Sequence, residues 1–138
     1  MPIRTVNPAT GQDLATYETQ TRDAVMITAA RAAGTQRTWR DTALEERCRL
    51  VRELASVLRT NVDEWARLIT LEMGKPLQES RAEIEKCAWM SEVYADRAAE
   101  WLTEEEVDAD GLKHRVVFQP LGVVLSIMPW NLSLIHIS

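Results

Sequence analysis

A nearly continuous apolar run close to the end of the sequence most constrains the fold of this 138-residue chain. Such a run is typical of a strand that is buried on both faces of a parallel sheet. A parallel crossover needs about a dozen or more residues, and only residues 129–138 follow the run. The sequence therefore predicts a strand at 122–128 whose neighbours this chain does not supply. The apolar residues of the run are Val123, Val124, Leu125, Ile127 and Met128.

Helical periodicity dominates residues 22–102, where apolar side chains recur at three- and four-residue spacing in four segments. Thr21 is the expected N-cap of the first helix. Gly34 is expected to end or interrupt that helix, because Gly costs about 1 kcal/mol relative to Ala in a helix. Gly74 is expected to cap the third helix, and Pro76 to start a fourth that is the longest element.

Two short motifs predict the starts of the second and third helices. Thr42 and Glu45 form a T-x-x-E capping box, in which each side chain can accept a hydrogen bond from a free backbone amide of the other residue. Asn61 and Glu64 form a weaker N-x-x-E box. We therefore expect a break between the two helices near Thr60.

Strand signals lie on both sides of the helical region. Near the start, a turn at residues 7–11 precedes an expected short strand at residues 14–17. After the helices, the dipeptide Asp110-Gly111 is a strong hairpin turn signal, and alternating apolar residues follow it. The sequence predicts a β-hairpin within residues 103–120.

Charge and composition exclude several classes of partner. The 16 Lys and Arg residues are outnumbered by 21 Asp and Glu residues, and the net charge of −5 disfavours nucleic-acid binding. No stretch approaches the roughly 18 continuous apolar residues of a membrane span. The chain has two cysteines, Cys48 and Cys87, and no Cys/His cluster. This pattern predicts neither a disulfide framework nor a metal site. The cytoplasm is the compartment that this cysteine usage favours.

Few residues of the helical region are suited to catalysis. Cys48 and Cys87 lie on the apolar stripes of predicted helices, where a thiol is desolvated and unreactive, so we expect neither to be a nucleophile. Glu72 and Lys75 flank Gly74 and together look like a catalytic pair. We expect them instead to tie the ends of two helices together.

Three motifs lie along the chain: NPATG at residues 7–11, TLEMGKPLQESRAEIEKCAW at residues 70–89 and QPLGVVLSIMPWN at residues 119–131. In this order, they resemble the amino-terminal part of the aldehyde dehydrogenase superfamily, and their sequences are most similar to those of its bacterial succinate-semialdehyde dehydrogenases. The resemblance implies a truncated α/β fold: the helical part (22–102), an oligomerisation-type hairpin (103–120) and the first strand of a Rossmann-like cofactor domain (122–128).

The resemblance also implies an activity, the oxidation of a small-molecule aldehyde to the acid with NAD or NADP. Asn131 corresponds to the residue whose amide holds the oxyanion, and Ile127, Met128, Pro129 and Trp130 correspond to the edge of the cofactor cleft. In the family the catalytic cysteine, the catalytic glutamate and most of the cofactor site come later in the sequence. The resemblance therefore implies that this chain, as it stands, is inactive and does not bind the dinucleotide tightly.

The remaining expectations concern boundaries and partners. We expect a partial family domain over residues 1–131 and a non-family tail, LSLIHIS, at residues 132–138, which resembles translated sequencing adapter. The hairpin implies a homo-oligomer of the full-length parent, although it could equally fold back on its own helices. A competing hypothesis, which needs no resemblance, is a small α-helical interaction module without catalysis.

Overall fold

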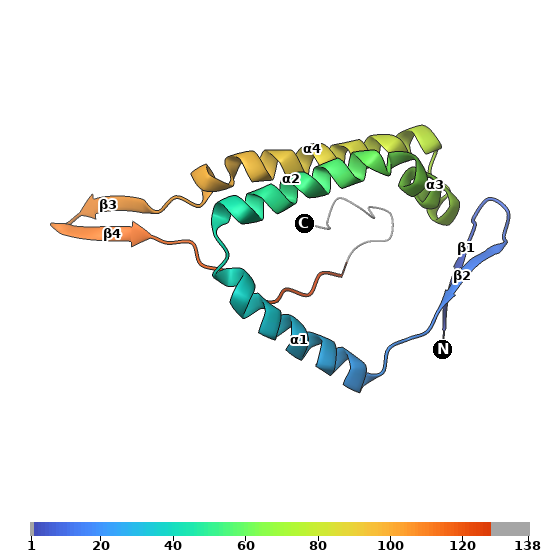
Figure 1. The fold of residues 1–138 in the computed structure, drawn as a ribbon, viewed down its shortest axis with the longest axis horizontal. Helices are drawn as coiled ribbons and strands as arrows, with labels where there is room; N and C mark the ends of the chain where they lie inside the picture. The colour runs from blue at the N-terminus through green and yellow to red at the C-terminus, as the bar shows by residue number, and fades with distance from the viewer. Residues whose placement is uncertain (1, 128–138) are drawn as a thin grey trace.

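The computed structural model describes residues 2–127, which form a mixed arrangement of helices and short antiparallel strand pairs. Helices α2 and α4 lie side by side, α1 diverges from them, and the pair β3–β4 extends past their end (Figure 1). This agrees with the α/β class expected from the sequence. The elements are β1 (Ile3–Val6), β2 (Asp13–Tyr17), α1 (Arg22–Arg40), α2 (Leu44–Thr60), α3 (Val62–Met73), α4 (Leu77–Trp101), β3 (Glu105–Ala109) and β4 (Leu112–Val116).

The hydrophobic core lies between α2, α3 and α4. Three of its seven buried members are alanines, and their small side chains let the helix backbones approach one another closely. Within the described residues, α1 contributes no buried side chain. The core residues are Ala55, Leu58, Ala66, Ile69, Ile84, Cys87 and Ala88.

Ion pairs join α2 and α4 along their exposed edge. Arg59 donates to Glu85 at 3.1 Å and also pairs with Glu92, whose pKa it lowers. Seven residues before Arg59 on α2, Arg52 contacts Asp96 of α4 at 2.8 Å. Exposed pairs of this kind add little stability, so their main effect is to favour one alignment of the two helices.

The start of α1 agrees with the sequence prediction, but its course does not. The Thr21 hydroxyl oxygen accepts a hydrogen bond from the Ala24 backbone amide at 3.2 Å, which confirms Thr21 as the N-cap. The predicted end or interruption at Gly34 is wrong, because α1 continues to Arg40. The cost of one glycine, about 1 kcal/mol, is small beside the summed helical preference of its many neighbours.

The two predicted capping boxes are also wrong, although the predicted break near residue 60 is confirmed. The Thr42 hydroxyl donates to the Thr38 carbonyl at 3.3 Å, and the N-cap of α2 is Ala43. The Asn61 side-chain amide donates to the Val57 carbonyl at 2.8 Å. Both side chains therefore satisfy the carbonyls that end the preceding helix rather than the amides that begin the next one.

Both strand pairs are antiparallel. The strand expected at residues 14–17 is present as β2, and it pairs with β1, which the sequence analysis did not predict. The expected hairpin is present as β3–β4, and Asp110 and Gly111 adopt φ values of 54° and 74° in its two-residue turn. A positive φ at both turn residues is the geometry that matches the twist of a two-stranded pair. The hairpin is exposed and is not folded back on the helices (Figure 1).

The strand predicted at 122–128 is not formed in the part of it that the structure describes. Residues 122–127 belong to no strand and pair with none of the described residues. An isolated segment cannot form a strand without a neighbour to accept and donate its backbone hydrogen bonds. Met128, the last residue of the predicted strand, lies outside the described residues.

Candidate functional site

Most of the site residues expected from the sequence lie outside the described residues. The site residues outside the described range are Met128, Pro129, Trp130 and Asn131. Ile127 is the last described residue, and 87% of its surface is exposed.

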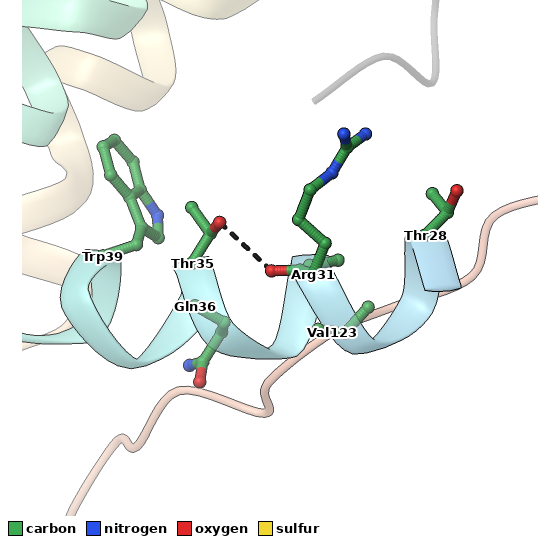
Figure 2. A pocket seen from close by; sticks show the side chains of 7 residues that line it. Thr28, Arg31, Thr35, Gln36, Trp39 and Val123 are labelled. Carbon is green, nitrogen blue, oxygen red and sulfur yellow. Dashed lines mark hydrogen bonds between the residues drawn. The ribbon is translucent and has the colours of Figure 1, made fainter. Parts of the chain in front are cut away.

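A shallow groove of about 370 Å³ lies nearby, between α1 and the segment that contains Val123. Figure 2 shows Arg31 and Thr35 of α1 at this groove, where the Thr35 hydroxyl donates to the Arg31 carbonyl at 3.2 Å. The lining includes one cation and no carboxylate, histidine or cysteine, so the groove has no group for acid–base or nucleophilic catalysis. Its lining residues are Thr28, Arg31, Ala32, Thr35, Gln36, Trp39 and Val123.

The two cysteines occupy structural positions, as the sequence predicts. Cys48 of α2 and Cys87 of α4 are both buried and free. Burial raises the pKa of the Cys87 thiol, and the nearby Glu83 carboxylate raises it further. A thiol with a raised pKa is a poor nucleophile at neutral pH, which excludes Cys87 from that role.

A buried ion pair joins the turn between α3 and α4 to the body of α4. The Lys75 ammonium pairs with Glu83, and only 5% of the Glu83 side chain is exposed. The second carboxylate oxygen of Glu83 has no hydrogen-bond partner among the described residues. The sequence pattern indicated Glu72, not Glu83, as the partner of Lys75, so this pair was not predicted. Lys75 precedes the start of α4 and Glu83 lies eight residues later, and this spacing matches no local pairing pattern that would predict the contact.

Two of the three sequence motifs meet in space. In the NPATG motif, the Asn7 side chain accepts a hydrogen bond from the Ala9 amide at 2.9 Å, and the Gly11 amide donates to the Asn7 carbonyl at 2.8 Å. This turn places Pro8 against Gly74 of the EMGKPL motif. Gly74 has a φ of 70° and caps α3, as the sequence predicts. The described contacts of both motifs are therefore structural.

The described region holds neither a cluster of metal ligands nor a membrane-spanning helix. Within residues 2–127, no three His, Cys, Asp or Glu side chains are grouped so that they could hold a metal ion. Nor does any helix in that range combine the length and the apolar character that crossing a membrane requires.

Comparison with known proteins gave consistent results. The aldehyde dehydrogenase family profile matches residues 1–138. A Synechocystis protein named "Probable succinate-semialdehyde dehydrogenase", with NADP(+) in its name, is 40% identical over 131 residues, which are 95% of this chain and 29% of that protein. The Mycobacterium tuberculosis succinate-semialdehyde dehydrogenase 1, also named for NADP(+), is 39% identical over 137 residues, 97% of this chain and 30% of that protein.

Solved structures agree with the sequence relatives. The succinic semialdehyde dehydrogenase of Streptococcus pyogenes, crystallised with NADP+ as the cofactor, superimposes with a TM-score of 0.91 at 31% identity. The match covers 97% of this chain and 30% of that structure. The chain thus spans less than a third of the length of these relatives.

Proposed function

This chain belongs to the aldehyde dehydrogenase family, and from that we propose that it supplies the amino-terminal part of an enzyme that oxidises succinate semialdehyde to the acid. The observation that carries the proposal is the 40% identity over 95% of the chain to a protein named for this substrate. The relatives' names favour NADP over NAD as the hydride acceptor.

The reaction needs a thiolate to attack the aldehyde carbon, donors that hold the resulting oxyanion, and a nicotinamide that accepts hydride. Cys48 and Cys87 are buried, so neither supplies the thiolate. Ile127 is too exposed to form the wall of a dinucleotide cleft on its own. The described residues therefore do not by themselves fit the cofactor, and we propose that the 138-residue polypeptide alone neither binds it tightly nor turns over.

Within the complete reaction, this chain contributes Asn131. A side-chain amide is an uncharged hydrogen-bond donor at every pH at which the enzyme works, which suits it to hold the oxyanion that forms when the carbonyl is attacked. In the same way, the resemblance assigns Ile127, Met128, Pro129 and Trp130 to the edge of the cofactor cleft in the complete enzyme. This assignment rests on the match of the PWN motif to the family.

The hairpin β3–β4 contributes to assembly of the complete enzyme into a homo-oligomer. Every residue of both strands is exposed, the pair extends away from the helices (Figure 1), and no other described strand pairs with either outer edge. Free edges of this kind allow strands of a neighbouring subunit to pair with them. Val107 and Leu112, which are exposed on this hairpin, supply apolar contact area.

A chimaera tests the proposed reaction. Residues 1–131 of this chain replace the matching segment of the Streptococcus pyogenes enzyme, and NADP+ reduction is measured with succinate semialdehyde. We expect the chimaera to be active and the 138-residue chain alone to match a heat-inactivated control. A chimaera that is folded by circular dichroism but inactive would contradict the assignment to this reaction. Turnover by the chain alone would contradict its proposed dependence on the remaining sequence.

A further inference from the structure

We propose that Asp110 is a site of spontaneous isomerisation, where the bond to Gly111 moves from the backbone carbonyl of Asp110 to its side-chain carboxyl group and the β3–β4 hairpin opens. The proposal concerns one bond in the turn of the hairpin and does not depend on the proposed reaction. It follows from the geometry of this turn and from the contrast with the other aspartates of the chain.

The reaction joins a side-chain carboxyl carbon to the next backbone nitrogen. The Gly111 nitrogen attacks the Asp110 Cγ atom and a C–N bond forms, while the amide proton and one carboxyl oxygen with its proton leave as water. Solvent water then opens the succinimide ring. When the original backbone C–N bond breaks, Asp110 stays joined to Gly111 through Cγ, and the composition of the chain is unchanged.

The turn leaves both reacting groups accessible to each other. A β-carbon added at position 111 would meet no atom within 4 Å, so no neighbouring group hinders the nitrogen. The Gly111 amide donates to no backbone carbonyl within residues 2–127. The cross-strand pair Ala109–Leu112 closes the turn on both sides. Its geometry is therefore set within the hairpin itself.

The other aspartates lack this combination. Asp110 is the one Asp or Asn of the sequence that precedes a glycine. The amide that follows Asp23 donates to the Thr21 hydroxyl at 3.2 Å, and the amide that follows Asp41 donates to the Trp39 carbonyl at 3.1 Å. Ion pairs also hold four of the other carboxylates, those of Asp13, Asp41, Asp63 and Asp96.

Isomerisation changes the length of the turn. The Cβ atom of Asp110 enters the main chain, whereas a two-residue turn matches the strand twist only with the positive φ values of 54° and 74° seen here. The strands β3 and β4 pair with each other and with no further described strand. A lone two-stranded pair is marginally stable, so the longer turn should open it.

Peptide mapping of the 138-residue chain after incubation at neutral pH tests the proposal. Trypsin releases residues 98–113 as one peptide, which contains both Asp108 and Asp110. We expect a second form of this peptide with the same mass, and electron-transfer fragmentation should place its β-linkage at Asp110. Asp108, which precedes Ala109 in β3, is the internal control and should stay unmodified.

Two substitutions separate the chemistry from the fold. Asp110→Glu keeps the charge but requires a larger ring, so the β-linked form should be lost. Asp110→Asn should form the same β-linked product faster, because ammonia leaves instead of water. The matched control Asp108→Glu should leave isomerisation at Asp110 unchanged. Helical circular dichroism shows that α2 and α4 are intact in each variant.

Amide hydrogen exchange measures the effect on the hairpin. Incubation should remove the protection of β3 and β4 in the wild-type chain but not in Asp110→Glu, and α2 and α4 should stay protected in both. The site is rejected if the β-linkage forms equally at Asp108, or if it forms at Asp110 only in urea. Unchanged hairpin protection in the isomerised chain would overturn the proposed opening.

Discussion

Pro8 packs against Gly74 so closely that a β-carbon at position 74 would lie 3.0 Å from the Pro8 Cγ atom. Pro8 belongs to the turn between β1 and β2, whereas Gly74 lies between α3 and α4. The contact therefore joins the start of the chain to a corner of the helical core.

Gly74→Ala should lower the free energy of unfolding by about 1–3 kcal/mol. A left-handed φ costs a non-glycine residue about 1–2 kcal/mol, and the new methyl group would also press on the Pro8 ring. Urea denaturation followed by circular dichroism measures the loss. Adding Pro8→Ala should recover the steric part but not the backbone part.

Gly34 provides the contrasting control for this substitution. Gly34 lies inside α1 with ordinary backbone, and a β-carbon added at this position would meet no atom within 4 Å. Gly34→Ala should therefore stabilise α1 locally by up to about 1 kcal/mol and increase its helicity. Equal effects of the two substitutions would contradict the role assigned to the Pro8 contact.

Lys75→Met should destabilise the fold more than Glu83→Gln does. The first change leaves the buried Glu83 carboxylate without its cation, at an expected cost of about 2–4 kcal/mol, while the second leaves a neutral amide in place of the charge. Urea denaturation near neutral pH measures both. Arg81→Ala is the control, because its pair with Asp63 is exposed and should contribute about 1 kcal/mol or less. Similar losses for Lys75→Met and Arg81→Ala would contradict the importance of burial.

Cys87 should make the stability of the chain depend on pH under alkaline conditions. Its pKa in the folded chain is raised above the ordinary value of 9.0, so the unfolded chain releases the thiol proton first. The stabilisation is complete below pH 9 and is lost as pH rises from there toward the folded pKa. Denaturation midpoints between pH 8 and pH 10 should therefore fall more steeply in the wild-type chain than in Cys87→Ala. Parallel pH profiles would show that this thiol does not contribute.

Asn131→Ala, introduced into the active chimaera, should reduce kcat by about 10²–10³, the usual effect of removing one oxyanion donor. The KM for succinate semialdehyde should change much less, because the oxyanion forms only after the carbonyl is attacked. Steady-state kinetics separates the two constants. An unchanged kcat would remove Asn131 from the proposed mechanism.

The sequence predicted the helices well because their buried positions repeat with the helical period. In each helix, the buried residues are spaced so that they share one face, and this face packs in the core. Examples are Ala55 and Leu58 on α2, and Ile84, Cys87 and Ala88 on α4. Gly74 and the Asp110-Gly111 turn were predictable for a related reason. Each requires a backbone conformation that few other residues adopt.

The failed predictions depended on partners that a local pattern does not specify. Thr42 and Asn61 lie where one helix ends and the next begins, and each side chain bonds to the earlier helix. The apolar run at 122–127 has the composition of a buried strand, but no described strand lies beside it. The pair Lys75–Glu83 could not be predicted from a local pattern either, because the contact depends on how the chain turns at Gly74.

Among the described residues, the core cluster draws on residues 55–88, and α4 ends at Trp101. During synthesis, the helical unit can therefore close its interior once α4 has left the ribosome, before the hairpin and the apolar run are available. Since chains grow at about 5–20 residues per second, this order leaves seconds in which the unit can fold first. The later segments would then add to a nascent chain that is already compact.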